Sequence, residues 1–328
     1  MISRLVSIAP MMGWTDRHAR YFFRIISEHA LLYTEMVNTG ALLHNRQKVG
    51  NQKRLLAYHA SEHPVALQLG GSDPQALAAC AAMVEDAGFD EVNLNVGCPS
   101  DRVKTGQFGA CLMAKPELVA DCVAAMKGEV KIPVTVKCRI GIDDMDEYVA
   151  LENFVSIVEA AGCDAFIVHA RKAWLQGLSP KQNREIPPLR YDYVYRLKKE
   201  KPLLSVSING GIKTFEQMQQ QLAHVDGVMI GREAYHNPYI LAGVDKLIYK
   251  KAEAEVKSRE QIVLQMCEYI DSEISQGVAL HSISRHMLGL FQGQRGARIW
   301  RRYISENSHL PGVDSEVLKT ALDKMLSI

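Results

Sequence analysis

Hydrophobic residues gather in short runs along the first two thirds of the chain, and longer amphipathic stretches separate these runs. Each run is rich in β-branched or apolar residues and is short, which favours a strand over a buried helix. The runs that fit this description span residues 6–11, 31–37, 64–69, 91–96, 133–138, 165–170, 203–208 and 227–231. Their alternation with amphipathic stretches predicts a parallel sheet covered by helices.

Two of the amphipathic stretches have clear helix boundaries. Residues 73–88 open with Asp73 and Pro74 and close on Gly88, and Thr214 precedes a second stretch that runs to residue 225. Side chains of this kind cap the first turn of a helix, whereas glycine commonly ends one. We therefore expect helices over 73–88 and 214–225.

Eight strand–helix units in about 240 residues predict a closed (β/α)8 TIM barrel. A doubly wound sheet is the competing fold, but no G-x-G-x-x-G turn follows the first strand. From about residue 245 the helical periodicity continues without strands. The sequence thus predicts a barrel over residues 1–244 and a helical domain over 245–328.

Composition adds only broad limits. The 328 residues are 47% hydrophobic and 23% charged, as in ordinary globular proteins, and the net charge of +1 gives no global sign of a nucleic-acid partner. The 7 cysteines form no C-x-x-C pair, which argues against a zinc finger or a redox dithiol. The N-terminus is a poor signal peptide, and no uncharged stretch approaches the roughly 18 apolar residues of a membrane span. A cytoplasmic protein with free thiols is expected.

Polar and glycine residues cluster where the expected strands end. In a TIM barrel the carboxyl ends of the strands form the active site. Each residue alone has an ordinary explanation, such as a helix cap for Gln68 or a buried core position for His169, but their shared placement favours a site. The strand-end residues are Pro10, Met11, Met12, Glu35, Gln68, Asn95, Cys98, Lys137, Arg139, His169, Arg171, Asn209, Gly210, Gly211, Gly231 and Arg232.

The last two strand ends favour a phosphate. Asn209-Gly210-Gly211 follows the seventh strand, and Gly231-Arg232 follows the eighth. Glycine-rich loops there leave backbone N–H groups open to an anion, and barrels commonly bind phosphate at this position. A plain tight turn is the alternative for the first loop. Because both loops carry the pattern, we favour phosphate binding.

Lys137 and Cys98 are the candidate reactive groups. Lys137 can serve as a Schiff-base lysine or as a fixed positive charge beside a cofactor that becomes anionic on reduction, and the residues alone leave both roles open. Cysteine is usually a small buried hydrophobe, but Gly97 and Pro99 hold Cys98 in a turn, with Asn95 nearby. A protonated thiol beside an amide suggests proton delivery to a carbon of a base.

Several motifs together resemble the tRNA-dihydrouridine synthase family. They are "APMMGWTD", "LQLGG", "NLNVGCPSDRV", "VKCRIG", "HAR", "NGGI" and "IGREAYHNP". The segment "GLSPKQNREIPPLRY" resembles the A-type subfamily, whose targets are the D-loop uridines at positions 20 and 20a. The resemblance runs across the barrel and into the helical domain.

The resemblance implies a flavoenzyme that uses FMN and NADPH and reduces uridine in tRNA. Cys98 becomes the proton donor to uracil C5 while reduced flavin N5 delivers hydride to C6, Asn95 contacts the target base, and Lys137 stabilises the reduced flavin. The implied FMN contacts are Pro10, Met11, Met12, Gln68, Lys137, His169, Asn209, Gly210, Gly211, Gly231 and Arg232.

Basic residues also favour an RNA partner. No acid occurs between Glu273 and Glu306, whereas five arginines do: Arg285, Arg295, Arg298, Arg301 and Arg302. Arg295, Arg298 and Arg302 have the spacing of one helical face. A solvated face is the alternative, but it usually mixes signs of charge. The expected tRNA contacts are Asn95, Arg171, Lys181, Arg184, Arg295, Arg298 and Arg301.

Three other functions remain open at this point. They are a flavin enzyme acting on a free pyrimidine, a flavin-free Schiff-base lyase that uses Lys137, and a non-catalytic RNA-binding barrel. The one-sign arginine stretch argues against the first, and a non-catalytic protein leaves Cys98 and Lys137 unexplained. No metal, membrane or obligatory protein partner is expected. Residues 99–112 are expected to form a mobile loop that closes over the site.

Overall fold

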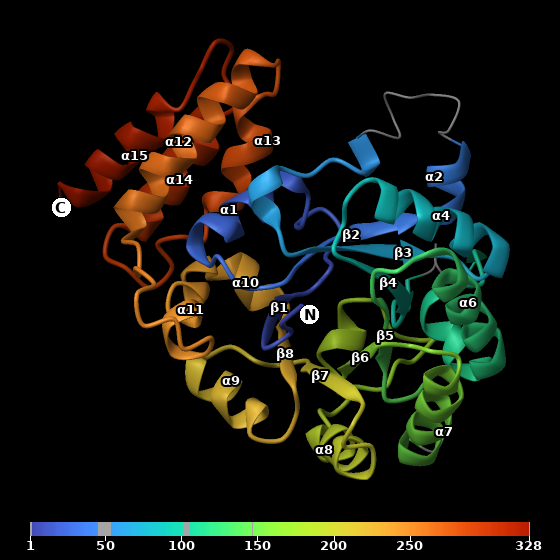
Figure 1. Ribbon diagram of the computed structural model, residues 1–328. Coiled ribbons are helices and arrows are strands. Elements are labelled where there is room, and N and C mark those ends of the chain that lie inside the picture. The colour runs from blue at the N-terminus through green and yellow to red at the C-terminus, as the bar shows by residue number, and fades with distance from the viewer. Residues whose placement is uncertain (1, 45–53, 101–104, 146, 328) are drawn as a thin grey trace. The chain divides into compact units, whose positions relative to one another are not determined.

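A single sheet of eight parallel strands dominates the first part of the chain (Figure 1). The computed structural model describes residues 2–44, 54–100, 105–145 and 147–327. The strands follow the order β1-β8-β7-β6-β5-β4-β3-β2. They are β1 (Val6–Ile8), β2 (Leu32–Asn38), β3 (Val65–Gly70), β4 (Glu91–Val96), β5 (Val134–Arg139), β6 (Ala165–His169), β7 (Ser205–Asn209) and β8 (Gly227–Ile230).

The first strand closes this sheet into a barrel. On one side, β1 pairs with β8 in parallel register. On the other, the Ile8 N–H donates to the Leu31 carbonyl (2.9 Å), and the Leu31 N–H donates to the Val6 carbonyl (3.0 Å). The eight expected strands and the predicted TIM barrel are therefore confirmed, and the doubly wound alternative is wrong.

Helices cover the outside of the barrel. They are α2 (Thr39–His44), α4 (Pro74–Asp86), α6 (Pro116–Glu129), α7 (Glu147–Ala160), α8 (Tyr191–Glu200) and α9 (Phe215–Leu222). The Asp73 side chain accepts from the Ala76 N–H (2.7 Å), and the Thr214 hydroxyl accepts from the Gln217 N–H (3.2 Å). Both expected helix starts are confirmed, and the helices end two or three residues earlier than the sequence suggested.

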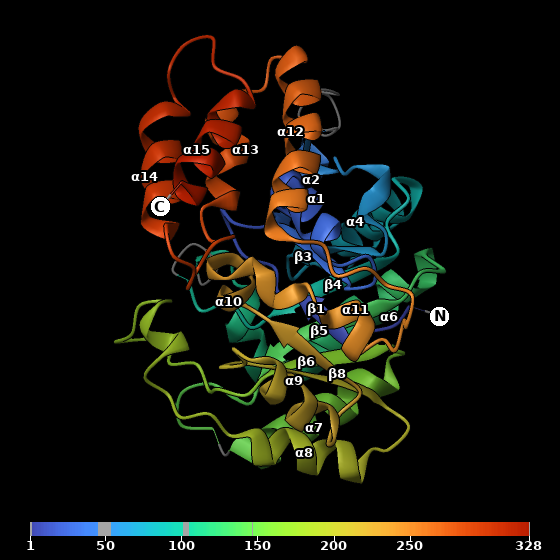
Figure 2. The ribbon, with the colours of Figure 1, turned by 90° about the vertical axis from the view of Figure 1, so that its left-hand side faces the viewer.

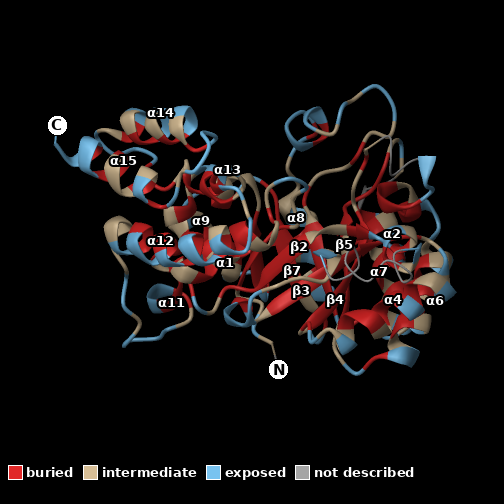
Figure 3. Ribbon diagram, turned by 90° about the horizontal axis from the view of Figure 1, so that it is seen from above, coloured by how far each residue is buried: buried red, intermediate tan, exposed pale blue. Residues whose placement is uncertain are grey.

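Alternate strand residues face the barrel interior, because neighbouring side chains on a strand point to opposite sides. All six residues of β4 are buried, and the strands stand out as buried in Figure 3. Part of the interior is apolar, with Tyr33, Ala66, Ile167 and Met229 in one cluster. The remainder is polar and leads to the carboxyl ends of the strands.

The chain divides into two compact units. The first comprises residues 1–12 and 31–231 and holds the barrel, and the second comprises 13–30 and 232–328. The helices of the second unit are α1 (Arg17–Ile26), α10 (Arg232–His236), α11 (Val244–Leu247), α12 (Arg259–Ser275), α13 (Leu280–Ser284), α14 (Ala297–Asn307) and α15 (Glu316–Leu326). None of the helices described is long and apolar enough to cross a membrane.

The second unit has its own core. Helices α14 and α15 pack together, and α12 packs on α15 (Figure 2). Trp300 is fully buried, its ring meets Phe291 edge-on, and its indole N–H donates to the Met287 carbonyl (3.1 Å). The segment 13–30 joins this unit because Arg17 forms an ion pair with Glu273. The C-terminal segment of this unit begins at residue 232, whereas sequence periodicity changes only near residue 245.

Candidate active site at the strand ends

Cys98 lies in a turn that Asn95 holds in place. The Asn95 side-chain oxygen accepts from the N–H groups of Gly97 (3.1 Å) and Cys98 (3.0 Å). The thiol is half-buried, and its sulfur donates to the Ser100 hydroxyl oxygen at 3.4 Å. A side chain at the end of β4 therefore fixes the backbone that presents the thiol.

Gln68 orients Asn95 from the neighbouring strand. The Asn95 Nδ2 donates to Gln68 Oε1 at 2.8 Å, and the two residues are 8% and 1% exposed. After these contacts Asn95 retains one amide hydrogen for another partner. The structure thus joins Gln68, Asn95 and Cys98, which the sequence could place only at separate strand ends.

Lys137 is a half-buried cation near the end of β5, with its ammonium enclosed by protein atoms. Its ammonium donates to Asn209 Oδ1 (3.1 Å), and among the residues described no carboxylate lies within ion-pairing distance. Burial and, to a smaller extent, the nearby positive charge of Arg139 together lower the pKa of Lys137 to about 8. A buried charge without a counter-ion favours an anionic ligand.

The turn after β7 requires its two glycines. Gly210 and Gly211 have φ angles of +118° and +74°, in the region that favours glycine. A Cβ at Gly210 would lie 2.8 Å from His169 Cδ2, and one at Gly211 would lie 2.6 Å from Leu189 Cδ1. The NGG motif is therefore more than a flexible turn, since it lets the backbone approach His169 closely.

Positive charge surrounds His169. Burial holds the pKa of His169 well below its ordinary value, and the charges of Arg139 and Lys137 act in the same direction. Arg171 and Arg184 contribute too, although Arg184 is exposed. At neutral pH the imidazole is uncharged, so it offers one hydrogen-bond donor and one acceptor inside a cationic site.

Arg139 connects two loops of the site, and it was absent from the predicted contacts. Its guanidinium donates to the carbonyls of Gly97 (2.9 Å), Lys172 (3.1 Å) and Asn183 (3.0 Å). Burial lowers its pKa to about 10. Its position two residues after Lys137 on β5 is the signal that points to it, because alternate residues share a face. Ser100 was missed as well, because sequence gives no sign that it meets the thiol.

The remaining predicted contacts of the barrel lie around this core. Met11 packs against the inner apolar cluster, and Met12 is 62% exposed. Pro10 is half-buried, Lys181 is exposed, and Arg171 donates to the carbonyls of Glu185 and Pro187. Gly231 follows β8, where a Cβ would lie 4.0 Å from Asn209 Nδ2.

The arginines of the second unit differ in exposure and in whether they form an ion pair within the protein. Arg298 and Arg301 are exposed on α14, Arg302 pairs with Glu306 (2.7 Å), and Arg232 begins α10. The prediction that Arg295 shares their helical face is wrong, because α14 begins only at Ala297, after a left-handed Gly296. Arg295 is exposed in the preceding turn.

Other groups in the basic stretch are already engaged within the second unit. Arg285 donates to Asp16 (2.6 Å), and His286 lies 3.0 Å from the same carboxylate. Burial opposes ionisation of Asp16, but the hydrogen bonds from His286, the Ala19 N–H and Arg285, together with the charge of His286, outweigh it and hold the pKa of Asp16 well below its ordinary value. Both residues are therefore structural partners here.

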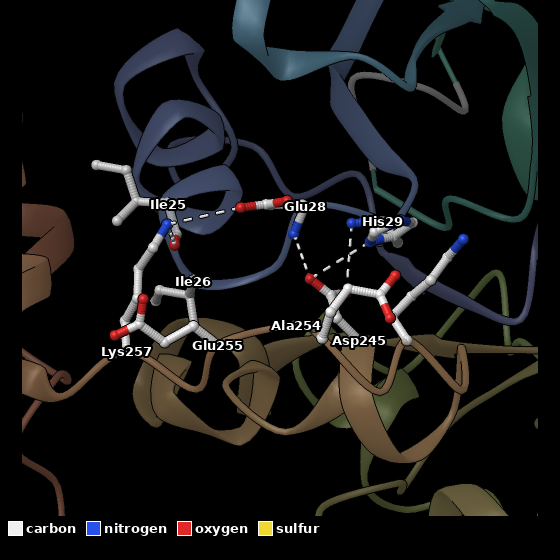
Figure 4. A pocket seen from close by; sticks show the side chains of 10 residues that line it. Ile25, Ile26, Glu28, His29, Asp245, Ala254, Glu255 and Lys257 are labelled. Carbon is white, nitrogen blue, oxygen red and sulfur yellow. Dashed lines mark hydrogen bonds and ion pairs between the residues drawn. The ribbon is translucent and has the colours of Figure 1, made fainter.

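A hollow of about 330 Å³ in the second unit is a poor candidate for a catalytic site (Figure 4). Its lining mixes signs of charge, with Lys257, Glu28 and Asp245 among the residues drawn. Asp245 is occupied, because it accepts from the Ser27 hydroxyl (2.7 Å) and the Glu28 N–H (2.6 Å). Asp245 therefore has a structural role, because it holds the turn at Ser27 and Glu28.

Two expectations concern the surroundings of the site. In the described ranges no group of three or more His, Cys, Asp or Glu side chains could hold a metal ion. Residues 101–104 of the loop 99–112 lie outside the described residues, so its closure stays a prediction. In the described part, the Ala110 N–H donates to the Cys98 carbonyl (2.9 Å).

The barrel is shared with known reductases. The chain superposes on 2-naphthoyl-CoA reductase with a TM-score of 0.56 at 12% identity, covering 74% of this chain and 50% of that one. For morphinone reductase the TM-score is 0.53 at 12% identity, with 73% and 84% covered. Likeness at this level of identity concerns the fold alone.

Sequence comparison narrows the class further. Residues 7–326 match the family model described as dihydrouridine synthase, and the chain belongs to this family of oxidoreductases. It is 60% identical over 320 residues to the tRNA-dihydrouridine(20/20a) synthase of Shewanella oneidensis, covering 98% of this chain and 93% of that protein. It is 59% identical to the Escherichia coli (strain K12) protein of the same name, with 96% and 90% covered. The resemblance inferred from the motifs is confirmed.

Proposed function

We propose that this protein reduces the C5–C6 double bond of uridine in tRNA to dihydrouridine with a bound flavin. Family membership and relatives at about 60% identity support the reaction. The observation that carries the proposal is the buried, cation-rich end of the barrel, where Lys137 and His169 lie beside the NGG turn and Cys98 follows the neighbouring strand β4. A reductive site needs positive charge for the anionic cofactor and a proton donor for the substrate.

The residues present fit FMN. The glycine backbone of the NGG turn would leave room for a phosphate beside His169, and Lys137, which contacts Asn209, would offer a positive charge to the pyrimidine side of the flavin. The proposed contacts are Pro10, Met11, Met12, Gln68, Lys137, His169, Asn209, Gly210, Gly211, Gly231 and Arg232. NADPH is the proposed source of electrons.

The chain's own residues would divide the chemistry. FMN held by these residues would supply, once reduced, the hydride from N5 to uracil C6. Cys98 holds a proton at Sγ and delivers it to C5, so that both atoms of the double bond are satisfied. Lys137 balances the negative charge that reduction places on the flavin. The remaining amide hydrogen of Asn95 is directed at the uracil.

The proposed substrate is a uridine at position 20 or 20a of the D-loop, as in the names of the similar proteins. Extruding a stacked base costs a few kcal/mol, which contacts to phosphates have to offset. The proposed tRNA contacts are Asn95, Arg171, Lys181, Arg184, Arg295, Arg298 and Arg301. A free pyrimidine would need no such set of cations.

The experiment is a product assay with tRNA transcript and NADPH. Nucleosides from the treated tRNA are separated and weighed, and we expect a uridine that has gained the mass of two hydrogen atoms. Cys98→Ala should retain its flavin, measured by the visible absorption, but should form product roughly 10²- to 10⁴-fold more slowly, the usual loss for a missing general acid. Full activity in Cys98→Ala would remove the thiol from the reaction, and unmodified tRNA with the native protein would refute the proposed function.

A further inference from the structure

A continuous chain of buried hydrogen bonds runs inside the barrel, starting at the Cys98 turn. Asn95 Nδ2 donates to Gln68 Oε1 (2.8 Å), and Gln68 Nε2 donates to Asn93 Oδ1 (2.8 Å). Asn93 Nδ2 then donates to the Thr135 hydroxyl (2.9 Å), which donates to Glu91 Oε1 (2.6 Å). These links explain why the otherwise apolar strand β4 carries an acid and two amides at alternate positions.

All donors in this row of hydrogen bonds point the same way, from Asn95 toward Glu91. The contacts of Asn95 set that direction. The N–H groups of Gly97 and Cys98 can only donate, so the oxygen of the Asn95 amide has to face them. The NH2 end of Asn95 then faces Gln68. Each following amide accepts on one side and donates on the other, because no other orientation leaves every link with one donor and one acceptor.

The contacts of Glu91, at the other end of this row of hydrogen bonds, require the same direction. The Glu91 carboxylate is 0% exposed, and Oε1 also accepts from the Tyr33 hydroxyl (2.5 Å), while Oε2 accepts from Arg4 Nε (3.0 Å). With donors on every side, this carboxylate acts as a pure acceptor. Thr135 must therefore give its only hydrogen to Glu91 and accept from Asn93.

We propose that Glu91 is a positioning residue for the active site. Acting through Thr135 and the buried amides, its carboxylate fixes which way the Asn95 amide faces. That orientation holds the Cys98 turn and leaves one Asn95 hydrogen for the target base. The contact between Asn95 and the target base rests on the proposed function. The support of the Cys98 turn by Asn95 does not depend on it.

The chain orients groups and does not conduct protons. A carboxamide that passes on a proton would have to change its bonding at both ends, whereas here each amide keeps one donor and one acceptor role. Burial of the five polar side chains Asn95, Gln68, Asn93, Thr135 and Glu91 costs free energy that an apolar interior would not. Each amide has a partner at its oxygen and a partner at its nitrogen, which is what a device for fixing amide orientation requires.

Thr135→Val tests the positioning role, because valine removes the hydroxyl and keeps the shape. Thr135→Ser restores the link, and Ser7→Ala removes another buried hydroxyl of the barrel interior, one that donates to the Val228 carbonyl (3.5 Å). If the valine variant does not fold, Thr135→Ala removes the same hydroxyl with less bulk.

The first readout is hydrogen exchange of the Gly97 and Cys98 amides, which needs no substrate. We expect exchange roughly tenfold faster in Thr135→Val and unchanged in Thr135→Ser and Ser7→Ala. The amide of Val206, which donates to Asp226 (2.8 Å) in the same barrel, is the internal reference. Equal exchange at Gly97 and Cys98 in Thr135→Val and the native protein would overturn the proposal, as would a parallel change at Val206.

The second readout is uridine reduction. Thr135→Val should lower kcat roughly tenfold and leave the KM for tRNA within about twofold, because the substrate contacts outside the barrel interior are intact. A merely destabilised protein would instead lose exchange protection everywhere. If the native protein reduces no tRNA, the proposed function fails, and the exchange experiment still decides the role of Glu91.

Discussion

Lys137 carries a positive charge that its surroundings disfavour. Its ammonium is enclosed, donates to Asn209 and faces Arg139, which adds like charge. Desolvation therefore disfavours the charged form, and the pKa falls to about 8, against about 10.4 for an exposed lysine. In the absence of a ligand this cost to stability is fully present below pH 8. This destabilisation disappears as the pH rises from the pKa of Lys137 in the folded protein to its pKa in the unfolded chain. In that interval the unfolded chain binds more protons than the folded protein, so stability increases with pH.

A pH dependence of cofactor affinity follows for this residue. FMN, which is anionic through its phosphate, binds the protonated lysine better, so FMN affinity should fall as the pH rises above about 8, by up to tenfold per pH unit while Lys137 dominates the titration. Fluorescence titration of FMN into the cofactor-free protein at several pH values measures this. Lys137→Met should bind more weakly and lose the dependence. The same slope in Lys137→Met would mean that another group titrates.

Individual side chains also mark what the sequence could predict. Cys98, Lys137 and His169 were recognisable as strand-end residues because a barrel brings strand ends together. The roles of Asn93 and Thr135 were hidden, since a polar residue within an apolar run does not reveal its partner. The partner comes from the register between strands, here Asn93 opposite Thr135.

At the scale of elements, α14 presents the arginines that are proposed to contact RNA phosphates. Ala297, Trp300 and Ile304 face the core of the second unit, and this leaves Arg298 and Arg301 in solvent. Arg301 donates to Gln292 (2.9 Å), a neutral partner that leaves its charge uncompensated. Arg302 is balanced by Glu306.

Replacement of Arg298 and Arg301 by glutamine should weaken tRNA binding and flatten its dependence on salt. Each lost phosphate contact lowers the slope of log affinity against log salt by roughly one. Binding isotherms at several salt concentrations give that slope. NADPH oxidation without tRNA should not change.

The matched control is the double variant Arg196→Gln and Lys319→Gln. It removes the same amount of positive charge, but from exposed side chains that already pair with Glu200 (2.7 Å) and Glu316 (3.3 Å). Its slope should equal that of the native protein. An equal flattening in both double variants would indicate a general charge effect and remove α14 from the interface.

The elements themselves were predictable to different degrees. The strands could be found because each is a short apolar run, and the caps at Asp73 and Thr214 marked helix starts. The start of α14 could not be found, because spacing suggests a helix through Arg295, whereas Gly296 adopts a left-handed conformation with a φ of +79°. Arginine spacing carries no information about where a helix begins.

For the whole molecule, the alternation of strands and helices predicted the barrel, and closure depends on contacts that alternation does not specify. The segment 13–30 was assigned to the barrel from its position in sequence, but it belongs to the second unit. The cause is packing over long sequence separation, as in the hydrogen bond between His18 and Tyr269 (2.7 Å). Such pairings have no local signal.

The central claim is that electrons leave the bound flavin for tRNA. The most direct measurement reduces the flavin-loaded protein with NADPH in the absence of oxygen, adds unmodified tRNA transcript, and follows the visible absorption band of the flavin. We predict that the bleached band returns with tRNA and stays bleached with a free pyrimidine. A band that stays bleached with tRNA would contradict the account.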